Sequence, residues 1–162
     1  MKVGIIGAGN IGKELYKRSR DNNWGINFIL RSDGVYKDLS DKIDNIEDYK
    51  DYSDVDCVFL AIPTLDDGET AFEYMKYFLE KNIPVITCEK GAMSNYFHHL
   101  KKFRNKIGYG ATVGGGTRLL YYLEERINAN VEEIHAVING TLNYVFDEVS
   151  RGRSLGEVVE EA

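Results

Sequence analysis

The sequence predicts an α/β fold in which a parallel sheet carries helices on both faces. Short apolar runs alternate with amphipathic stretches through residues 1–110, an order typical of parallel strands joined by crossover helices. The pattern changes near Tyr109, and residues 111–162 combine helical stripes with one alternating run. We therefore expect a doubly wound sheet domain over residues 1–110 and a partial α+β domain over residues 111–162.

Four strands of the first domain are predicted from short apolar runs. They cover residues 3–6, 27–30, 57–62 and 84–88. These runs are nearly continuous rather than alternating, as expected for strands that are covered on both faces. Residues 32–56 are polar and acidic, and no clear element is predicted there.

Helices are predicted where apolar residues recur every three or four positions. The stripes of the first domain are Ile11, Leu15 and Tyr16; Ala71, Phe72, Met75, Phe78 and Leu79; and Tyr96, Phe97, Leu100 and Phe103. Those of the second are Leu119, Leu120, Leu123 and Ile127, then Leu142, Val145, Phe146 and Val149. Between them, Ile134, Ala136 and Ile138 alternate as in a strand with one buried face. Ser154 with Glu157 predicts a capping box that opens a last helix.

Composition narrows the class of protein. Apolar residues make up 43% of the 162 residues, enough for a packed core. The net charge of −6 argues against nucleic-acid and anionic-membrane partners, and no apolar run has the length of a membrane span. Met1 leads directly into a strand without the layout of a signal peptide, so a cytoplasmic protein is expected. Cys57 and Cys88 sit in apolar stretches and are expected to be buried thiols rather than metal ligands.

A glycine motif follows the first predicted strand. Its sequence is Gly7-Ala8-Gly9-Asn10-Ile11-Gly12, between a strand and a helix. Gly7 permits a tight turn, Gly9 lets the backbone approach a pyrophosphate, and Gly12 allows close packing of helix on strand. The free N–H groups at the helix start favour an anion. The motif predicts a dinucleotide site in a Rossmann-type domain, and the alternative is a glycine turn that binds nothing.

The end of the second strand indicates which dinucleotide binds. Arg31 and Ser32 stand where an acid would accept hydrogen bonds from the ribose of NAD. A guanidinium and a hydroxyl suit a 2′-phosphate, so NADP is expected, while the nearby Asp33 keeps NAD possible. A solvated loop charge is the alternative for Arg31. Thr64, after the third strand, is expected to touch ribose or nicotinamide, unless it only ends the strand.

Three further segments are candidates for substrate contacts. Lys90 follows the fourth strand and should face the ligand crevice, although a surface lysine would look the same. The glycines of residues 113–116 precede a helix and could bind a carboxylate through their N–H groups, or form a hinge. Residues 139–141 lie between a strand and a helix, where spacing alone favours a helix N-cap.

Two motifs together resemble homoserine dehydrogenase. They are Ala111-Thr112-Val113-Gly114-Gly115-Gly116 and Asn139-Gly140-Thr141-Leu142-Asn143-Tyr144. The resemblance implies interconversion of L-homoserine and L-aspartate 4-semialdehyde with a nicotinamide cofactor, a step towards threonine and methionine. By resemblance, Lys90 contacts cofactor and substrate and is the candidate catalytic residue. Gly114, Gly115, Asn139, Gly140 and Thr141 would form one wall of the substrate pocket, and a sheet containing residues 133–139 would form a homodimer interface.

The chain departs from the family pattern at several positions. Glu89 stands where the family often has Asn, and Thr117-Arg118 replaces an apolar residue and Pro. Some family members bind sodium through backbone carbonyls, here those of Val113, Gly115 and Thr117. A Glu side chain that completes that site is replaced by Gly110, which argues against sodium.

Family enzymes are also longer than this chain, and their substrate-binding acids and catalytic lysine lie further on. Cofactor binding is therefore expected, with turnover depending on that further part. Two other interpretations stay open: a related enzyme, such as an aspartate dehydrogenase or a dihydrodipicolinate reductase relative, and a non-catalytic NAD(P)-binding or sensing protein. The motif at residues 139–144 argues against the related enzymes.

Overall fold

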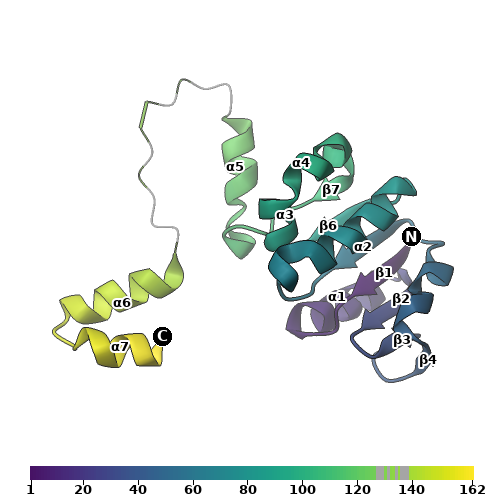
Figure 1. Cartoon of the computed structure of the whole chain (residues 1–162), viewed down its shortest axis with the longest axis horizontal. Helices are drawn as coiled ribbons and strands as arrows, with labels where there is room; N and C mark the ends of the chain where they lie inside the picture. The colour runs from purple at the N-terminus through teal and green to yellow at the C-terminus, as the bar shows by residue number, and fades with distance from the viewer. Residues whose placement is uncertain (127–129, 131, 134, 136–138) are drawn as a thin grey trace. The chain divides into compact units, whose positions relative to one another are not determined.

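The computed structural model describes residues 1–126, 130, 132–133, 135 and 139–162. These residues form two compact units, Met1–Glu124 and Glu125–Ala162. Figure 1 shows both units along the chain. The predicted strand through Ile134, Ala136 and Ile138, and the helical position Ile127, lie outside the described residues.

The first unit is built on a sheet whose strand order is β4-β3-β2-β1-β5-β6-β7, with seven strands among the described residues. The strands are β1 (Lys2–Ile6), β2 (Gly25–Arg31), β3 (Gly34–Tyr36), β4 (Lys42–Asp44), β5 (Cys57–Leu60), β6 (Val85–Thr87) and β7 (Ile107–Gly108). All four predicted strands are present, and the α/β class with a Rossmann-type sheet is confirmed.

Helices and 3-10 turns connect these strands. The α-helices of the first unit are α1 (Asn10–Asp21), α2 (Glu69–Glu80), α3 (Gly91–Asn95), α4 (Phe97–Leu100) and α5 (Leu119–Glu125). The 3-10 segments are η1 (Ile46–Tyr52), η2 (Asp66–Gly68), η3 (Lys101–Lys106) and η4 (Gly115–Thr117). Across the described part of the chain, none of the helices has both the length and the apolar character needed to cross a membrane.

The sheet is parallel only from β2 to β7. β1 pairs in parallel with β2 and β5, and β5, β6 and β7 continue in the same direction. By contrast, β3 and β4 add antiparallel strands at the edge next to β2. The predicted parallel sheet is therefore present, with an antiparallel hairpin added at this edge. Ser32 and Asp33 form a two-residue turn that reverses the chain directly after Arg31, which pairs with Gly34.

Apolar side chains alternate between the two faces of the sheet. On the α1 face, Val3, Ile5 and Phe59 are buried with Leu15 and Tyr16 of the helix. On the opposite face, the fully buried side chains of Phe28, Met75 and Phe78 belong to the larger cluster around α2. Figure 1 shows α1 and α2 in the first unit with the strands between them. The two faces thus account for the nearly continuous apolar runs of β1, β2 and β5.

Two predicted helices differ in detail. Ile11 is 53% exposed, and the apolar side chains by which α1 packs on the sheet are the partly buried Leu15 and Tyr16. The helix predicted through residues 96–103 consists of α4 and η3, and α3 precedes it. Tyr96 separates α3 from α4 because its backbone has φ −116° and ψ 10°, outside the helical range, while its ring stacks on Phe72 at 4.6 Å.

The first unit extends to α5 through contacts that the sequence does not reveal. The Arg104 Nη2 atom lies 3.2 Å from Glu124 Oε1, and the hydroxyl of Tyr109 donates to the same oxygen. Gly110 lies so close to the ring of Tyr121 that a Cβ atom would overlap it. These contacts attach residues 109–124 to the sheet, whereas the functional division at residues 110 and 111 stays a prediction.

The second unit contains a helical hairpin of α6 (Gly140–Ser150) and α7 (Leu155–Glu161). Asn139 caps α6 because its side chain accepts a hydrogen bond of 2.8 Å from the Leu142 N–H. Ser154 caps α7 in the same way, accepting from the Glu157 N–H at 3.3 Å. Both helix starts predicted from spacing are therefore confirmed.

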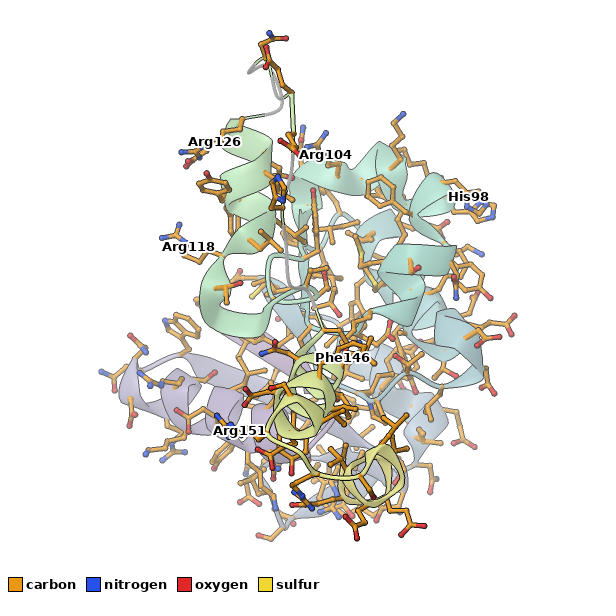
Figure 2. All side chains as sticks on the ribbon, turned by 90° about the vertical axis from the view of Figure 1, so that its left-hand side faces the viewer. His98, Arg104, Arg118, Arg126, Phe146 and Arg151 are labelled. Atoms are coloured by element: carbon orange, nitrogen blue, oxygen red, sulfur yellow. The ribbon has the colours of Figure 1, made fainter. Side chains whose placement is uncertain are left out.

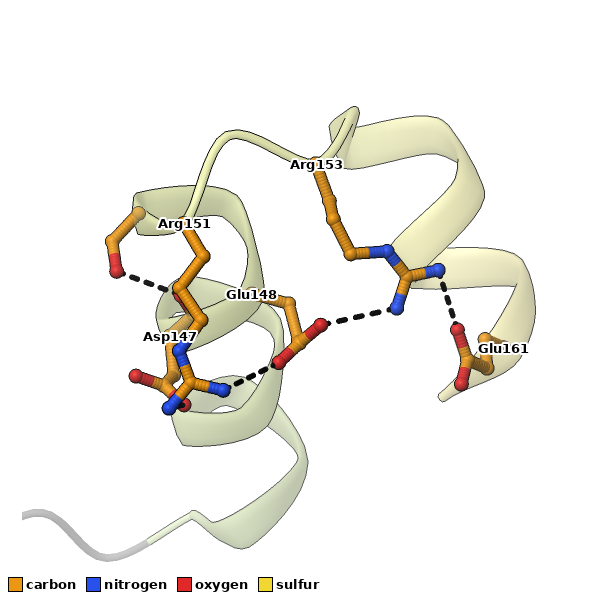
Figure 3. Close-up of polar contacts among 6 residues, drawn as sticks. Asp147, Glu148, Arg151, Arg153 and Glu161 are labelled. Atoms are coloured by element: carbon orange, nitrogen blue, oxygen red, sulfur yellow. Dashed lines mark hydrogen bonds and ion pairs between the residues drawn. The ribbon is translucent and has the colours of Figure 1, made fainter.

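Two arginines at the turn between these helices form ion pairs, as Figure 3 shows. Arg153 reaches Glu148 on α6 at 3.1 Å and Glu161 on α7 at 2.6 Å. Arg151, at the end of α6, pairs with Asp147 and Glu148. The pairing with Glu161 is the largest cause that raises the pKa of Arg153. The two ion pairs of Arg153 connect the helices within the second unit, while those of Arg151 stay at the end of α6.

The close packing of α1 on β1 generates a first prediction. A Cβ atom at Gly12 would overlap the carbonyl oxygen of Gly7. We expect Gly12→Ala to lower the free energy of unfolding of the first unit by about 1–3 kcal/mol, the usual cost of overpacking. Urea unfolding followed by the fluorescence of Trp24, which stacks on Phe59 at 6.2 Å, measures this change.

Gly9→Ala is the matched control for that measurement, since a Cβ atom there meets nothing within 4 Å. Its cost should stay below about 1 kcal/mol, as for alanine in place of glycine at a helix N-cap. Equal losses in the two variants would contradict the packing argument.

Candidate functional site

A candidate site lies at the carboxyl ends of β1, β2 and β5. It is a pocket of about 620 Å³. Its walls include five of the residues predicted to bind cofactor, namely Gly7, Ala8, Gly9, Arg31 and Ser32, together with Pro63, Leu65 and Tyr74. The carboxyl ends of parallel strands are where ligands bind in such sheets. Glycines and a guanidinium from separate strands therefore share one pocket.

The glycine turn is held by main-chain contacts. Gly7 has φ 98°, a left-handed conformation that favours glycine, and its N–H donates to the Leu30 carbonyl at 2.8 Å. A Cβ atom at Gly7 would overlap the carbonyl oxygen of Ala61 on the neighbouring strand. β1, β2 and β5 thus meet at Gly7, which fixes the floor of the pocket.

Gly9 begins α1 and leaves space beside its backbone. A Cβ atom would meet no protein atom within 4 Å, so protein packing does not demand glycine here. No side chain caps the helix and its first turn carries no acid, while Asn10 and Ile11 are exposed. The unpaired N–H groups and the helix dipole suit an anion. The cradle therefore fits the pyrophosphate of a dinucleotide.

Arg31 lies at the opposite wall within a small polar cluster. Its Nη1 atom donates to the Leu39 carbonyl at 3.2 Å, and its Nε atom lies 3.5 Å from Asp33. The guanidinium also lies over the ring of Tyr36, 4.6 Å from its centre. A hydrogen bond from the Tyr36 hydroxyl lowers the pKa of Asp33. Asp33 is thus an anionic neighbour of the guanidinium, and Arg31 is oriented by the β2–β3 turn.

Thr64 is not among the pocket walls, although Pro63 and Leu65 on either side of it are. Its hydroxyl donates instead to Glu89 Oε1 at 2.5 Å. Glu89 is 2% exposed and lies two residues before the start of α3 at Gly91. At the sequence level Glu89 stands out only as a departure from the family pattern, and its place just before a helix was the signal that could have indicated a capping role.

Lys90 is exposed and lines a second pocket, of about 420 Å³. The other walls are Met93, Ser94, Phe97, Tyr109, Thr112, Val113 and Leu120. Thr112 is buried, and its hydroxyl donates to the Tyr109 carbonyl at 2.8 Å. The structure therefore brings Lys90 and the start of the predicted substrate motif to one pocket.

The glycine block adopts a left-handed path. Gly114 and Gly115 have φ 70° and 54°, and Arg118 follows with φ 57°. Gly115 and Arg118 contribute to a third pocket of about 390 Å³, and Figure 2 shows Arg118 projecting from the start of α5. Thr117 N–H donates to the Gly114 carbonyl at 3.0 Å, which closes the turn. The main-chain sodium site at Val113, Gly115 and Thr117 stays untested.

The remaining predicted substrate residues lie in the second unit. Asn139 uses its side-chain oxygen for the helix cap, while Gly140 and Thr141 form the exposed first turn of α6. Among the residues that the structure describes, no group of three His, Cys, Asp or Glu side chains is placed to hold a metal ion. Cys57 and Cys88 are free thiols, and burial raises the pKa of both.

Comparisons with known proteins agree with the resemblance that the two sequence motifs indicated. A family model described as homoserine dehydrogenase matches residues 120–162. A homoserine dehydrogenase of Pyrococcus horikoshii is 29% identical over 58% of this chain and 31% of its own length. One of Sulfurisphaera tokodaii is 26% identical over 100% of this chain and 59% of its own. An NAD(+)-dependent homoserine dehydrogenase of Pseudomonas canavaninivorans is 26% identical over 59% of this chain and 29% of its own.

A solved structure has the same fold. It is a hyperthermophilic archaeal homoserine dehydrogenase in complex with NADPH, with a TM-score of 0.82 at 19% identity. The match covers 99% of this chain and 60% of that one. This chain therefore spans less than two thirds of the length of each relative described here.

Fold and site together define a Rossmann-type α/β domain with a glycine-turn pocket at the carboxyl ends of its strands. The more particular resemblance predicted from the sequence motifs is also confirmed. By its family-model match and its relatives, this chain is similar to the homoserine dehydrogenases.

The position of Arg31 generates a second prediction. We expect Arg31→Asp to raise the dissociation constant for NADPH by about tenfold or more, because an anion would face the 2′-phosphate in place of a guanidinium. The dissociation constant for NADH should change little. Titration of both cofactors by fluorescence measures the two constants, and equal changes would contradict the assignment of Arg31.

Proposed function

We propose that this chain provides the cofactor site of an NADP-dependent oxidoreductase that interconverts L-homoserine and L-aspartate 4-semialdehyde. The observation that carries the proposal is the coincidence of two independent features. The glycine turn and Arg31 share one pocket in the first unit, and the match to the homoserine dehydrogenase family model begins at residue 120. The first feature indicates a dinucleotide, and the second indicates the reaction.

The chemistry of the pocket walls supports NADP. The pyrophosphate would lie against Gly9 and the N–H groups of α1, and the 2′-phosphate against Arg31 and Ser32. The N–H groups of α1 and the side chains of Arg31 and Ser32 are both hydrogen-bond donors suited to anions. When bound, the nicotinamide cofactor supplies or accepts the hydride. The residues of the pocket bind and orient it.

Lys90 is our candidate for the group that acts on the substrate. Its ammonium group is exposed at a pocket that also contains Thr112 and Val113 of the resemblance motif. An ammonium there would donate a hydrogen bond to a carbonyl or alkoxide oxygen and stabilise negative charge on it. We further propose that Gly114, Gly115, Asn139, Gly140 and Thr141 contribute to substrate binding, as the resemblance implies.

Asp33 supports an alternative cofactor. It lies 3.5 Å from Arg31 and partly offsets its charge, and one relative bears the name of an NAD(+)-dependent enzyme. A carboxylate near the end of β2 is the usual partner of the NAD ribose. NAD is therefore the second candidate.

The central experiment measures binding and turnover on the same protein. We expect NADPH to bind the purified chain, and Gly9→Ala to weaken this binding about tenfold by crowding the pyrophosphate. A spectrophotometric assay with L-homoserine and NADP then tests the reaction, with Lys90→Met as the catalytic variant. Absence of NADPH and NADH binding would contradict the cofactor site.

Binding without turnover of L-homoserine would contradict the proposed reaction for this chain and favour a cofactor-binding or sensing protein. Turnover of another amino acid would favour a related dehydrogenase. Because Gly9→Ala is expected to keep its fold, its binding defect can be read separately from stability.

We also infer self-association of the chain as a homodimer. In the second unit, the helices α6 and α7 expose large apolar side chains, of which Phe146 is 66% and Val159 58% exposed. Figure 2 labels Phe146 on α6. Exposed apolar surface of this kind favours association. Light scattering at micromolar concentration should give a dimer mass that Phe146→Glu reduces, and a monomeric wild-type mass would contradict the inference.

A further inference from the structure

We propose that Glu89 is a positioning residue of the cofactor site. Its buried carboxylate connects the loop after β5 to the start of α3 and so holds Pro63 and Leu65 in the pocket wall. This inference rests on the proposed cofactor function. It assigns to Glu89 a role in cofactor affinity that acts through Thr64 rather than through contact with the cofactor.

Three hydrogen bonds define the connection. Glu89 Oε1 accepts from the Thr64 hydroxyl at 2.5 Å and from the Gly91 N–H at 2.6 Å, and Oε2 accepts from the Ala92 N–H at 2.7 Å. The Glu89 N–H in turn donates to the Thr87 hydroxyl at 3.0 Å. The carboxylate thus joins loops that follow two adjacent parallel strands, β5 and β6.

The charge state of the side chain matters to this arrangement. The two N–H partners can only donate, and an ionised carboxylate accepts at both oxygens. An amide in its place would turn its NH2 group towards one of these donors. Since Glu89 is 2% exposed, water would not easily replace a lost partner. The site therefore demands a carboxylate rather than a polar side chain of the same size.

The loop that Glu89 holds is itself strained. Asp66, Asp67 and Gly68 follow one another with φ 48°, 54° and 95°. Two non-glycine residues in the left-handed region carry a conformational cost, and surrounding contacts must maintain it. The Thr64–Glu89 bond restrains the loop before this segment, and the Asn95 side chain donates to the Asp67 carbonyl at 2.7 Å. Glu89 and Asn95 therefore restrain the chain just before the strained segment and within it.

Close approach of two glycines brings the loop within reach. A Cβ atom at Gly68 would overlap the main chain of Gly91 and Ala92, and one at Gly91 would lie 2.7 Å from the Thr64 methyl carbon. The backbones touch directly, which leaves Glu89 2% exposed beneath them. This packing accounts for a connection between residues 25 apart in the sequence.

The bond between Thr64 and Glu89 affects the cofactor pocket because the two neighbours of Thr64 in the sequence line it. Pro63 and Leu65 both line the 620 Å³ pocket, and Thr64 between them is the anchored residue. Lys90, which lines the neighbouring pocket, directly follows Glu89. One carboxylate thus fixes a wall of the cofactor pocket and the base of the candidate catalytic lysine.

Glu89 could instead serve only as a cap for α3, and substitutions at Thr64 separate the two roles. Thr64→Val removes the hydroxyl donor but leaves both backbone bonds to Gly91 and Ala92. Thr64→Ser keeps the donor. We expect Thr64→Val to raise the dissociation constant for NADPH about three- to tenfold, and Thr64→Ser to stay near wild type. A pure cap predicts no change in either variant, which would overturn the proposal.

A double-mutant cycle then distinguishes action through Glu89 from direct contact of Thr64 with the cofactor. Glu89→Gln should weaken NADPH binding at least as much as Thr64→Val does. In a Glu89→Ala background, which removes the acceptor of the Thr64 hydroxyl altogether, Thr64→Val should have no further effect beyond about twofold. An undiminished effect in that background would mean that Thr64 acts on the cofactor directly and would overturn the proposal.

A structural readout accompanies the binding data. Amide hydrogen exchange of Gly91 and Ala92 should accelerate in Glu89→Gln and stay unchanged in Thr64→Val. Glu69→Gln is the control for charge, since Glu69 is an exposed acid in the first turn of α2 that lines neither pocket. It should bind NADPH as wild type does, and a loss equal to that of Glu89→Gln would overturn the proposal.

The outcomes remain separate from those of the proposed function. Failure of the wild-type chain to bind any nicotinamide cofactor contradicts the proposed function and, with it, the role of Glu89. Wild-type binding that Thr64→Val leaves intact contradicts the role of Glu89 alone. If Glu89→Gln does not fold, the Thr64→Val and Thr64→Ser pair still decides the question in a protein whose α3 cap is intact.

Discussion

The contact between α1 and the end of β1 is the constraint on which the site depends. Gly12 lies against the carbonyl of Gly7 with no room for a side chain. This contact directs the start of α1 at the pocket, so that its N–H groups face a ligand. The Gly7 N–H also donates to the Leu30 carbonyl near the end of β2. This bond fixes the position of the next residue, Arg31. The backbone contacts of Gly7 thus position both the start of α1 and the guanidinium of Arg31.

Much of the sheet domain could be predicted because its signals are local. The apolar runs of β1, β2, β5 and β6 and the glycine turn follow from backbone geometry and burial alone. The β3–β4 hairpin was missed, since each of its strands has only three residues and both lie within a largely polar stretch of the sequence. Ile11 was predicted to lie on the buried face of its helix but is exposed. Helical spacing alone does not show which face meets the sheet, and here it is Gly12 that lies against the end of β1 at Gly7.

The candidate site was predicted less completely, for a different reason. Residues at strand ends could be named, but the partners of their side chains depend on contacts between distant segments. Thr64 was expected to touch the cofactor, yet its hydroxyl is bonded to Glu89, 25 residues away. Likewise, Glu124 joins the first unit through Arg104 and Tyr109. Spacing along a sequence does not encode such pairings, whereas a helix cap such as Asn139 is short-range and was predicted correctly.

The turn that follows Arg31 has an evolutionary consequence. Ser32 and Asp33 are exposed at the tip of the β2–β3 hairpin, where Asp33 accepts a hydrogen bond from the Tyr36 hydroxyl. Mutations at such a tip disturb little packing and cost little stability. In the proposed cofactor site, the preference for one nicotinamide dinucleotide over the other can therefore change within a lineage while the scaffold is kept, so that descendants of one ancestor diverge in redox coupling through a few loop substitutions.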